Sequence, residues 1–275
     1  MTDAMSEPTA PGEPKVITRV DGRVLHITLN RPARRNAIDS ETNHLLQAAL
    51  NRYAADDDLW VAVIRGAGEQ AFSAGGDLKA MMEAAQGGPA YVIPETGYAG
   101  LTSRFDLDKP VIAAVNGFAF GGGFEIALAA DIVIAAEHAE FCLPEPKSGI
   151  VAYAGGMHRL TRQIPLKRAM QLLLTCARLS AREAQQWGIV SEVVPYAELD
   201  AAVERTVQSI LACAPIAIRA TKQCVQRGAD LSLREAIAGQ ETGLYPALEQ
   251  MRASGDVFEG IAAFVEKRTP NWQGR

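Results

Sequence analysis

Strand-like and helix-like patterns alternate along this 275-residue chain up to about residue 196, and helical patterns alone follow. The segment 24–29 alternates apolar and polar side chains, as a half-buried strand does, and 60–64 and 111–115 are continuous apolar runs typical of buried strands. Between the first two, a helical stripe begins at about Ser40. Strands that alternate with helices build a sheet covered by helices, so the chain is predicted to be an α/β protein.

Later segments extend the pattern and divide the chain. Further strands are predicted at 132–135, 141–143 and 189–194, and helices at 124–130, at 180–188 behind a capping-box pattern, and at 197–212, 215–227, 232–252 and 256–267. The first fourteen residues hold three prolines and no apolar run, so neither structure nor a signal peptide is expected there. The expected organisation is a disordered tail (1–14), a core that holds the active site (15–196) and a helical C-terminal region (197–275).

The composition narrows the class of function. A net charge of −5 without a basic stripe disfavours nucleic acid or an anionic membrane as partner. The apolar stretch 111–136 contains four glycines and two acidic residues, which suits a strand, a turn and a buried helix better than a membrane span. The four cysteines form no C-x-x-C pair and the four histidines lack ligand spacing. We therefore expect no metal, free thiols and a reducing, cytoplasmic location.

Two glycine-rich turns, at 71–78 and 116–125, each stand between a predicted strand and a predicted helix. Glycine lets the backbone approach a ligand closely, and a helix N-terminus presents free N–H groups. Two such turns facing each other would give a pair of donors for one oxyanion; the competing interpretation is that they are tight turns needed only for packing. A dinucleotide fingerprint is weak, since its third glycine falls at Ile126, and no G-x-S-x-G hydrolase motif is present.

Two glutamates lie in apolar surroundings. Glu125 stands in the first turn of the predicted helix 124–130, and Glu145 follows an apolar segment that ends in Pro144. Carboxylates in such surroundings have pKa values open to tuning, which general acid–base catalysis requires. The alternative is structural: each caps a helix or pairs with a base such as Lys147.

The motifs around these residues resemble the crotonase (enoyl-CoA hydratase/isomerase) superfamily from about residue 15 to the end. The resemblance is carried by Asn30-Arg31-Pro32, Phe72-Ser73-Ala74-Gly75-Gly76-Asp77-Leu78, Lys109-Pro110-Val111-Ile112-Ala113-Ala114-Val115-Asn116-Gly117, Gly121-Gly122-Gly123-Phe124-Glu125, Ala130-Asp131, Pro144-Glu145, Gly155-Gly156, Arg159-Leu160, Trp187-Gly188-Ile189-Val190 and Ala263-Phe264-Val265-Glu266-Lys267-Arg268. It implies a spiral of ββα units with a C-terminal helical trimerisation region, giving a trimer or a dimer of trimers. It also implies an acyl-coenzyme A substrate and no separate cofactor, since coenzyme A enters as part of that substrate.

The resemblance also assigns roles by position. Gly76 and Gly122 match the oxyanion-hole residues, and Glu125 and Glu145 match the two hydratase glutamates. The residues that match coenzyme A contacts are Ala74, Gly76, Leu78 and Lys79 in the first glycine turn, and Phe264 and Lys267 near the C-terminus.

Within the superfamily, the predicted activity is that of an enoyl-CoA hydratase, a hydro-lyase. The alternative is carnitinyl-CoA dehydratase, which the chain resembles at 100–102, 107–110, 117–121 and 272–275. Isomerase activity is disfavoured because both hydratase glutamates are present, and a non-enzymatic RNA-binding role is disfavoured by the charge. The chain departs from the family pattern at 150–155, where the bulky Tyr153 stands in the active-site loop.

Overall fold

The computed structural model describes residues 13–275. The predicted tail lies outside the described residues up to position 12. Pro14, the last residue of the predicted tail, contacts the core, because its carbonyl accepts a hydrogen bond of 3.0 Å from the Asn30 side-chain amide. Four short 3-10 helices occur among the described residues: η1 (Pro32–Arg34), η2 (Tyr98–Gly100), η3 (Glu145–Ser148) and η4 (Tyr196–Glu198).

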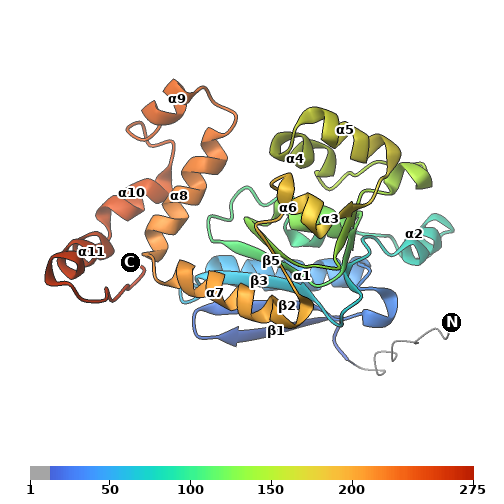
Figure 1. Ribbon diagram of the computed structural model, residues 1–275, viewed down its shortest axis with the longest axis horizontal. Coiled ribbons are helices and arrows are strands. Elements are labelled where there is room, and N and C mark those ends of the chain that lie inside the picture. Colours follow the sequence, from blue (N-terminus) through green and yellow to red (C-terminus); the bar gives the residue numbers. More distant parts are fainter. Residues whose placement is uncertain (1–12) are drawn as a thin grey trace.

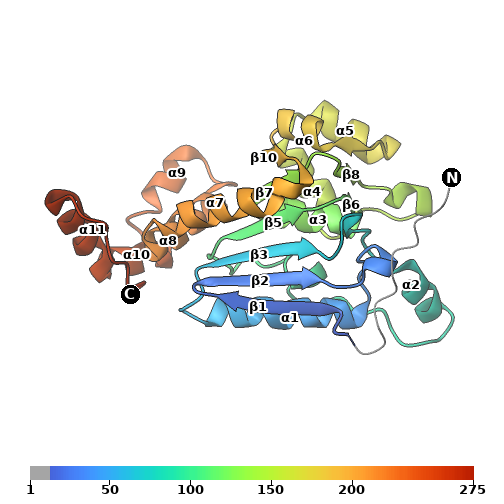
Figure 2. The same ribbon diagram turned by 60° about the horizontal axis from the view of Figure 1, so that its bottom comes forward.

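A six-stranded sheet forms the centre of the core (Figure 2). Its strands, in spatial order, are β1 (Val16–Asp21), β2 (Val24–Leu29), β3 (Val61–Gly66), β5 (Val111–Val115), β7 (Ile132–Ala136) and β10 (Glu192–Val194). β1 and β2 are antiparallel, and the other neighbours are parallel. The sequence pattern did not predict β1, since only Val16 of that edge strand is buried. It predicted β10 too long, because Ile189 and Val190 are buried in the loop before it.

Helices cover both faces of this sheet. In β3, Val61 and Val63 pack in the cluster that includes α7 (Leu199–Leu211), whereas Ala62 and Ile64 pack in the cluster that includes α1 (Ser40–Ala55). A strand buried on both faces needs apolar side chains at every position, and this explains the continuous apolar runs of β3 and β5. Burying one such Val or Ile contributes roughly 1.5–3 kcal/mol.

The core repeats one structural unit three times. Each unit places one strand in the large sheet, the next in a four-stranded sheet of order β4-β6-β8-β9, and then a helix. The units are β3, β4 (Ala71–Ser73) and α2 (Leu78–Ala85); β5, β6 (Phe118–Phe120) and α3 (Gly122–Ala129); and β7, β8 (Glu140–Cys142) and α4 (Gly156–Gln163). β4, β6 and β8 are parallel, and β9 (Leu179–Ser180) pairs antiparallel with β8. This arrangement confirms the predicted α/β spiral of ββα units.

The helices α5 (Leu166–Thr175) and α6 (Ala181–Gln186) complete this part of the core. α6 opens with the predicted capping box, in which the Ser180 hydroxyl accepts from the Glu183 N–H and the Glu183 carboxylate accepts from the Ser180 N–H. Neither α4 nor α5 was predicted from the pattern.

The C-terminal helices α8 (Pro215–Gly228), α9 (Leu233–Ala238), α10 (Pro246–Ala253) and α11 (Gly255–Glu266) project from the core, with α11 at its far end (Figure 1). The single predicted helix 232–252 is wrong. Gly243 adopts a φ of +77° and Pro246 begins α10, so a right-handed helix does not continue between α9 and α10. Since α7 packs on the sheet, the projecting part begins with α8; the regional limits at residues 196 and 197 stay predictions.

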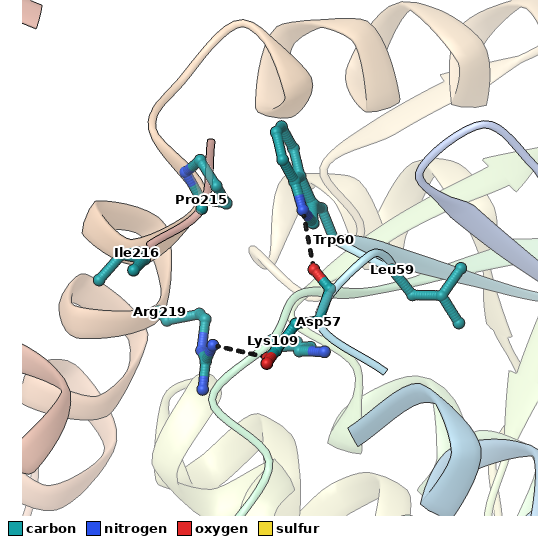
Figure 3. A pocket seen from close by; sticks show the side chains of 8 residues that line it. Asp57, Leu59, Trp60, Lys109, Pro215, Ile216 and Arg219 are labelled. Carbon is teal, nitrogen blue, oxygen red and sulfur yellow. Dashed lines mark hydrogen bonds and ion pairs between the residues drawn. The ribbon is translucent and has the colours of Figure 1, made fainter. Parts of the chain in front are cut away.

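A small cavity marks the junction between core and projection (Figure 3). Asp57 lines it, and the Asp57 carbonyl accepts from the Trp60 indole N–H at 3.1 Å while its carboxylate lies 3.6 Å from the Arg219 guanidinium. These contacts join the end of α1 to α8. No helix of the described residues is by itself long and apolar enough to cross a membrane; the pair Tyr196–Leu211 and Pro215–Gly228 passes on length and composition together but is bent by 100°.

Candidate active site

The candidate site lies at the carboxyl ends of the parallel strands β4, β6 and β8. The turn Gly75-Gly76 follows β4, the turn Gly121-Gly122 follows β6, and Glu145 follows β8 after two residues. Ligands of open parallel sheets bind at this edge, because every strand there ends in a loop or a helix N-terminus. The repeated unit therefore brings together residues that lie far apart in the sequence.

Backbone hydrogen bonds from Ile38 fix the first glycine turn. The Ile38 N–H donates to the Gly75 carbonyl at 2.8 Å, and the Ile38 carbonyl accepts from the Asp77 N–H at 2.9 Å. These two bonds lie on either side of Gly76, and the Gly76 N–H takes part in neither. Asp77 caps α2 and forms a 2.9 Å ion pair with Arg31, which holds the end of the turn.

The second glycine turn packs directly against the first. Gly121 adopts a φ of +53°, and its N–H donates to the Cys142 carbonyl at 2.8 Å. Gly75 adopts a φ of +85°, and a Cβ there would lie 2.7 Å from the Phe120 oxygen and 2.9 Å from the Gly122 nitrogen. Only glycine satisfies both the positive φ and this approach. The two turns are therefore tightly packed, and this packing also positions their N–H groups.

Two N–H groups remain available where the turns meet. Neither the Gly76 nor the Gly122 N–H donates a hydrogen bond to another residue in the range 13–275. Gly122 begins α3, so the positive end of that helix dipole adds to its donor strength. The arrangement is suited to one developing negative oxygen.

Glu125 is buried in the first turn of α3, with 3% of its surface exposed. Its Oε1 accepts a 2.8 Å hydrogen bond from the N–H of Gly156, the first residue of α4. Burial raises the pKa of Glu125 from 4.5 to about 7; the Gly156 N–H opposes the shift, and the negative charge of Glu145 adds to it. A carboxyl group with a pKa near the working pH can accept or release a proton in catalysis.

Glu145 opens η3 on the other side of the second glycine turn. A Cβ at Gly121 would lie 2.9 Å from the Glu145 Oε1, so the carboxylate lies directly against that glycine. Its Oε2 is buried and has no hydrogen-bond partner among the described residues. Burial raises the pKa of Glu145. Neither glutamate forms an ion pair with a described residue, so the alternative of pairing with Lys147 is wrong.

The residues predicted to contact coenzyme A fall into two groups. Ala74, Leu78 and Lys79 lie beside Gly76, and the Lys79 ammonium has one weak contact of 3.9 Å, to Glu83. Phe264 and Lys267 lie at the end of α11, on the opposite side of the molecule from α2 (Figures 1 and 2). A single chain therefore does not bring the second group to the site.

Sequence reasoning missed three contributors to the site. A Cβ at Gly76 would lie 2.3 Å from the Met81 Cε and 3.4 Å from the Tyr91 hydroxyl, so Tyr91 lies beside the first turn together with Met81. A Cβ at Gly122 would lie 2.3 Å from the Tyr98 ring, so Tyr98 covers the second turn. The third is Gly156, whose N–H holds Glu125. Glycines at 97 and 100 around Tyr98 were the available signal. No cluster of three or more metal-ligating side chains occurs in the described part of the chain.

Comparisons with known proteins agree with this geometry. Residues 19–275 match the family Enoyl-CoA hydratase/isomerase. The chain is 44% identical to carnitinyl-CoA dehydratase of Salmonella typhi over 93% of this chain and 97% of that one. It is similar to the crystal structure of enoyl-CoA hydratase from Mycobacterium tuberculosis H37Rv, with a TM-score of 0.88, 37% identity and coverage of 96% and 100%. It is also similar to the crystal structure of carnitinyl-CoA hydratase from Mycobacterium avium, with a TM-score of 0.73, 39% identity and coverage of 95% of this chain and 99% of that one.

The fold and the site thus define a crotonase-fold enzyme of the hydro-lyase type. The chain belongs to the Enoyl-CoA hydratase/isomerase family.

Proposed function

We propose that this protein adds water reversibly to a 2-enoyl-CoA thioester. The observation that carries the proposal is the pair of buried glutamates, free of ion pairs, beside two available N–H groups. Water addition needs a base for the water, an acid for C2 and donors for the enolate oxygen, and this set supplies all three. No covalent intermediate is required, so no nucleophile is missing.

In the proposed reaction, the Gly76 and Gly122 N–H groups bind the thioester oxygen and stabilise it as an enolate. Glu125, as carboxylate, takes a proton from the water while the hydroxide adds to C3. Glu145, as carboxylic acid, delivers its proton to C2. One water is consumed, and the C2–C3 double bond becomes a single bond that carries hydrogen and hydroxyl.

The two glutamates must hold opposite protonation states for this sequence. The negative charge of Glu145 raises the pKa of Glu125, so two negative charges on this pair are disfavoured relative to one shared proton. Burial raises the pKa of Glu125 to about 7 and raises that of Glu145, and this supports a pair that keeps one proton near neutral pH.

We further propose that the active unit is a trimer or a dimer of trimers. α11 exposes an apolar stripe, with Phe258, Ile261, Phe264 and Val265 each more than 60% exposed. A second copy that covers this stripe would also bring Phe264 and Lys267 to a neighbouring site. Light scattering should find no stable monomer at micromolar concentration.

The proposed setting is fatty acid metabolism in the cytoplasm, without a nucleic acid or membrane partner and without a cofactor besides the coenzyme A of the substrate. The net charge of −5 and the absence of a basic stripe support the part of this proposal that excludes a nucleic acid or anionic membrane partner.

A second candidate substrate is crotonobetainyl-CoA, which undergoes the same chemistry on an acyl group with a quaternary ammonium. It is favoured by the relatives at 44% identity that are named carnitinyl-CoA dehydratase.

The test is a spectrophotometric hydration assay that follows loss of the enoyl thioester absorbance over a panel of substrates. The panel holds straight-chain 2-enoyl-CoAs of increasing length and crotonobetainyl-CoA. A kcat/KM for crotonyl-CoA above that for crotonobetainyl-CoA supports the first candidate, and the reverse order supports the second. If the protein hydrates no substrate of either class, the proposal is contradicted.

A further inference from the structure

One buried hydroxyl in the site has no partner. Tyr98 is 5% exposed, and its hydroxyl has no hydrogen-bond partner within 3.5 Å among the described residues. The neighbouring Tyr91 hydroxyl donates to the Ile38 carbonyl at 2.7 Å instead. A Cβ at Gly122 would lie 2.9 Å from the Tyr98 oxygen, so the Tyr98 hydroxyl lies against the turn that carries the oxyanion donor. Buried polar groups without partners are rare and weaken a fold. The site therefore keeps an unused donor.

The loop that carries Tyr98 is fixed in a strained conformation. The Tyr98 N–H donates to the Thr102 hydroxyl at 2.8 Å, and the Ala99 N–H donates to the Asn43 side-chain carbonyl at 2.8 Å. Ala99 adopts a φ of +56°, which non-glycine residues rarely do. Such strain persists where the surroundings impose it, and it concentrates at functional sites.

The same helix orients Tyr98 and Glu125. The Arg159 guanidinium, on α4, donates to the Thr102 carbonyl at 2.8 Å and so holds the Tyr98 loop. Gly156, at the start of α4, donates to Glu125. The tyrosine and the carboxylate are therefore held in one frame.

The raised pKa of Tyr98 keeps its hydroxyl protonated near neutral pH, so it can act as a donor. Burial raises the pKa of Tyr98 well above its usual value, and the charges of Tyr91, Glu125 and Glu145 raise it further. Glu145 lies against Gly121, and Glu125 stands in the first turn of α3, so the phenol, which lies against Gly122, faces the turn that both glutamates flank.

Without Tyr98, the proposed hydration includes no group that donates a hydrogen bond to the oxygen of the reacting water. Glu125 takes a proton from the water, and the Glu145 proton goes to C2, so neither donates to the water oxygen. The Gly76 and Gly122 N–H groups are occupied by the thioester oxygen. A water that attacks with one lone pair has a second lone pair that accepts a hydrogen bond.

We propose that Tyr98 is a third catalytic residue, whose hydroxyl donates a hydrogen bond to the oxygen that adds to C3, first as water and then as the β-hydroxyl. The phenol keeps its proton throughout and only orients this oxygen. The inference rests on the proposed hydration, and it is tested with Tyr98→Phe.

Two reactions separate this role from a structural one. Hydration of crotonyl-CoA needs the oxygen at C3, whereas exchange of the C2 protons of butyryl-CoA in D₂O needs only the enolate. Tyr98→Phe should lower the hydration kcat by about 10²-fold, the lower end of the loss for one oxyanion-hole donor. It should leave the exchange rate within about twofold of wild type, because no enolate contact is lost.

Tyr53→Phe is the matched control. The Tyr53 hydroxyl is buried far from the site and lies 2.7 Å from the Pro110 carbonyl and 3.1 Å from the Trp60 carbonyl. Its removal should lower the melting temperature and leave kcat unchanged, whereas Tyr98→Phe, which breaks no hydrogen bond, should not lower the melting temperature.

Unchanged hydration by Tyr98→Phe overturns the inference, and so does an equal loss of hydration and exchange. A wild-type protein that hydrates no enoyl-CoA overturns the proposed function itself, and the role of Tyr98 with it.

Discussion

Replacing Glu125 with glutamine should stabilise the protein above neutral pH while it abolishes hydration. Burial raises the pKa of this carboxyl from 4.5 to about 7. Between these values the folded protein holds a proton that the unfolded chain has released, so this group's contribution to stability falls as the pH rises. At about pH 8 the folded protein bears the full cost of a buried carboxylate, about 3 kcal/mol. Glutamine avoids that cost and still accepts from the Gly156 N–H.

The assay is denaturant unfolding of wild type and Glu125→Gln at about pH 5 and about pH 8, at one protein concentration. From the lower to the higher pH, the stability of the variant relative to wild type should rise by about 2.5 kcal/mol. Glu69→Gln is the control, since Glu69 is exposed and forms no ion pair among the described residues. The kcat for hydration should fall by about 10²–10⁴.

A stability difference that does not change with pH would refute the reasoning, because it would mean that Glu125 is not buried as an acid with a raised pKa. A variant that is stabilised at high pH and still hydrates enoyl-CoA would refute its catalytic role but not its burial.

Three further substitutions test the rest of the site. Glu145→Gln should also lose about 10²–10⁴ in kcat, and combining it with Glu125→Gln should cost far less than the product of the two losses, because residues that act as one unit are non-additive; single-turnover rates measure this. Gly122→Ala should abolish soluble active protein, because its Cβ would lie 2.3 Å from the Tyr98 ring; expression and circular dichroism measure this. Lys267→Ala should raise KM for acyl-CoA more than it lowers kcat, because its contact lies far from the reacting carbons; steady-state kinetics measure this, and an unchanged KM would remove Lys267 from the site.

The sequence predicted elements whose burial follows a simple period. β2 alternates because one of its faces is more exposed than the other, and β5 is apolar throughout because both its faces are covered. β1 escaped prediction because an edge strand with one buried residue has no period to detect. The helix expected at 232–252 failed because periodicity there continues through a break that Gly243 and Pro246 impose.

The candidate site was predictable where chemistry leaves a local mark. Glycines between a strand and a helix indicated the turns 71–78 and 116–125, and single glutamates in apolar segments indicated Glu125 and Glu145; the family resemblance singled out Gly76 and Gly122. The glycines at 97 and 100 around Tyr98 were too weak a signal, because a tyrosine between glycines is also an ordinary loop residue. The place of Tyr98 depends on contacts with Gly122, Asn43 and Thr102, which only the folded chain brings together.

The most direct test of the account is a crystal structure of Glu125→Gln with a bound 2-enoyl-CoA. The account predicts that the thioester oxygen lies about 2.7–3.1 Å from the nitrogens of both Gly76 and Gly122. It also predicts that C3 faces residue 125 and the Tyr98 hydroxyl, and that C2 faces Glu145. A thioester oxygen that contacts neither nitrogen, or an enoyl group that lies outside the space between residues 125 and 145, would contradict it.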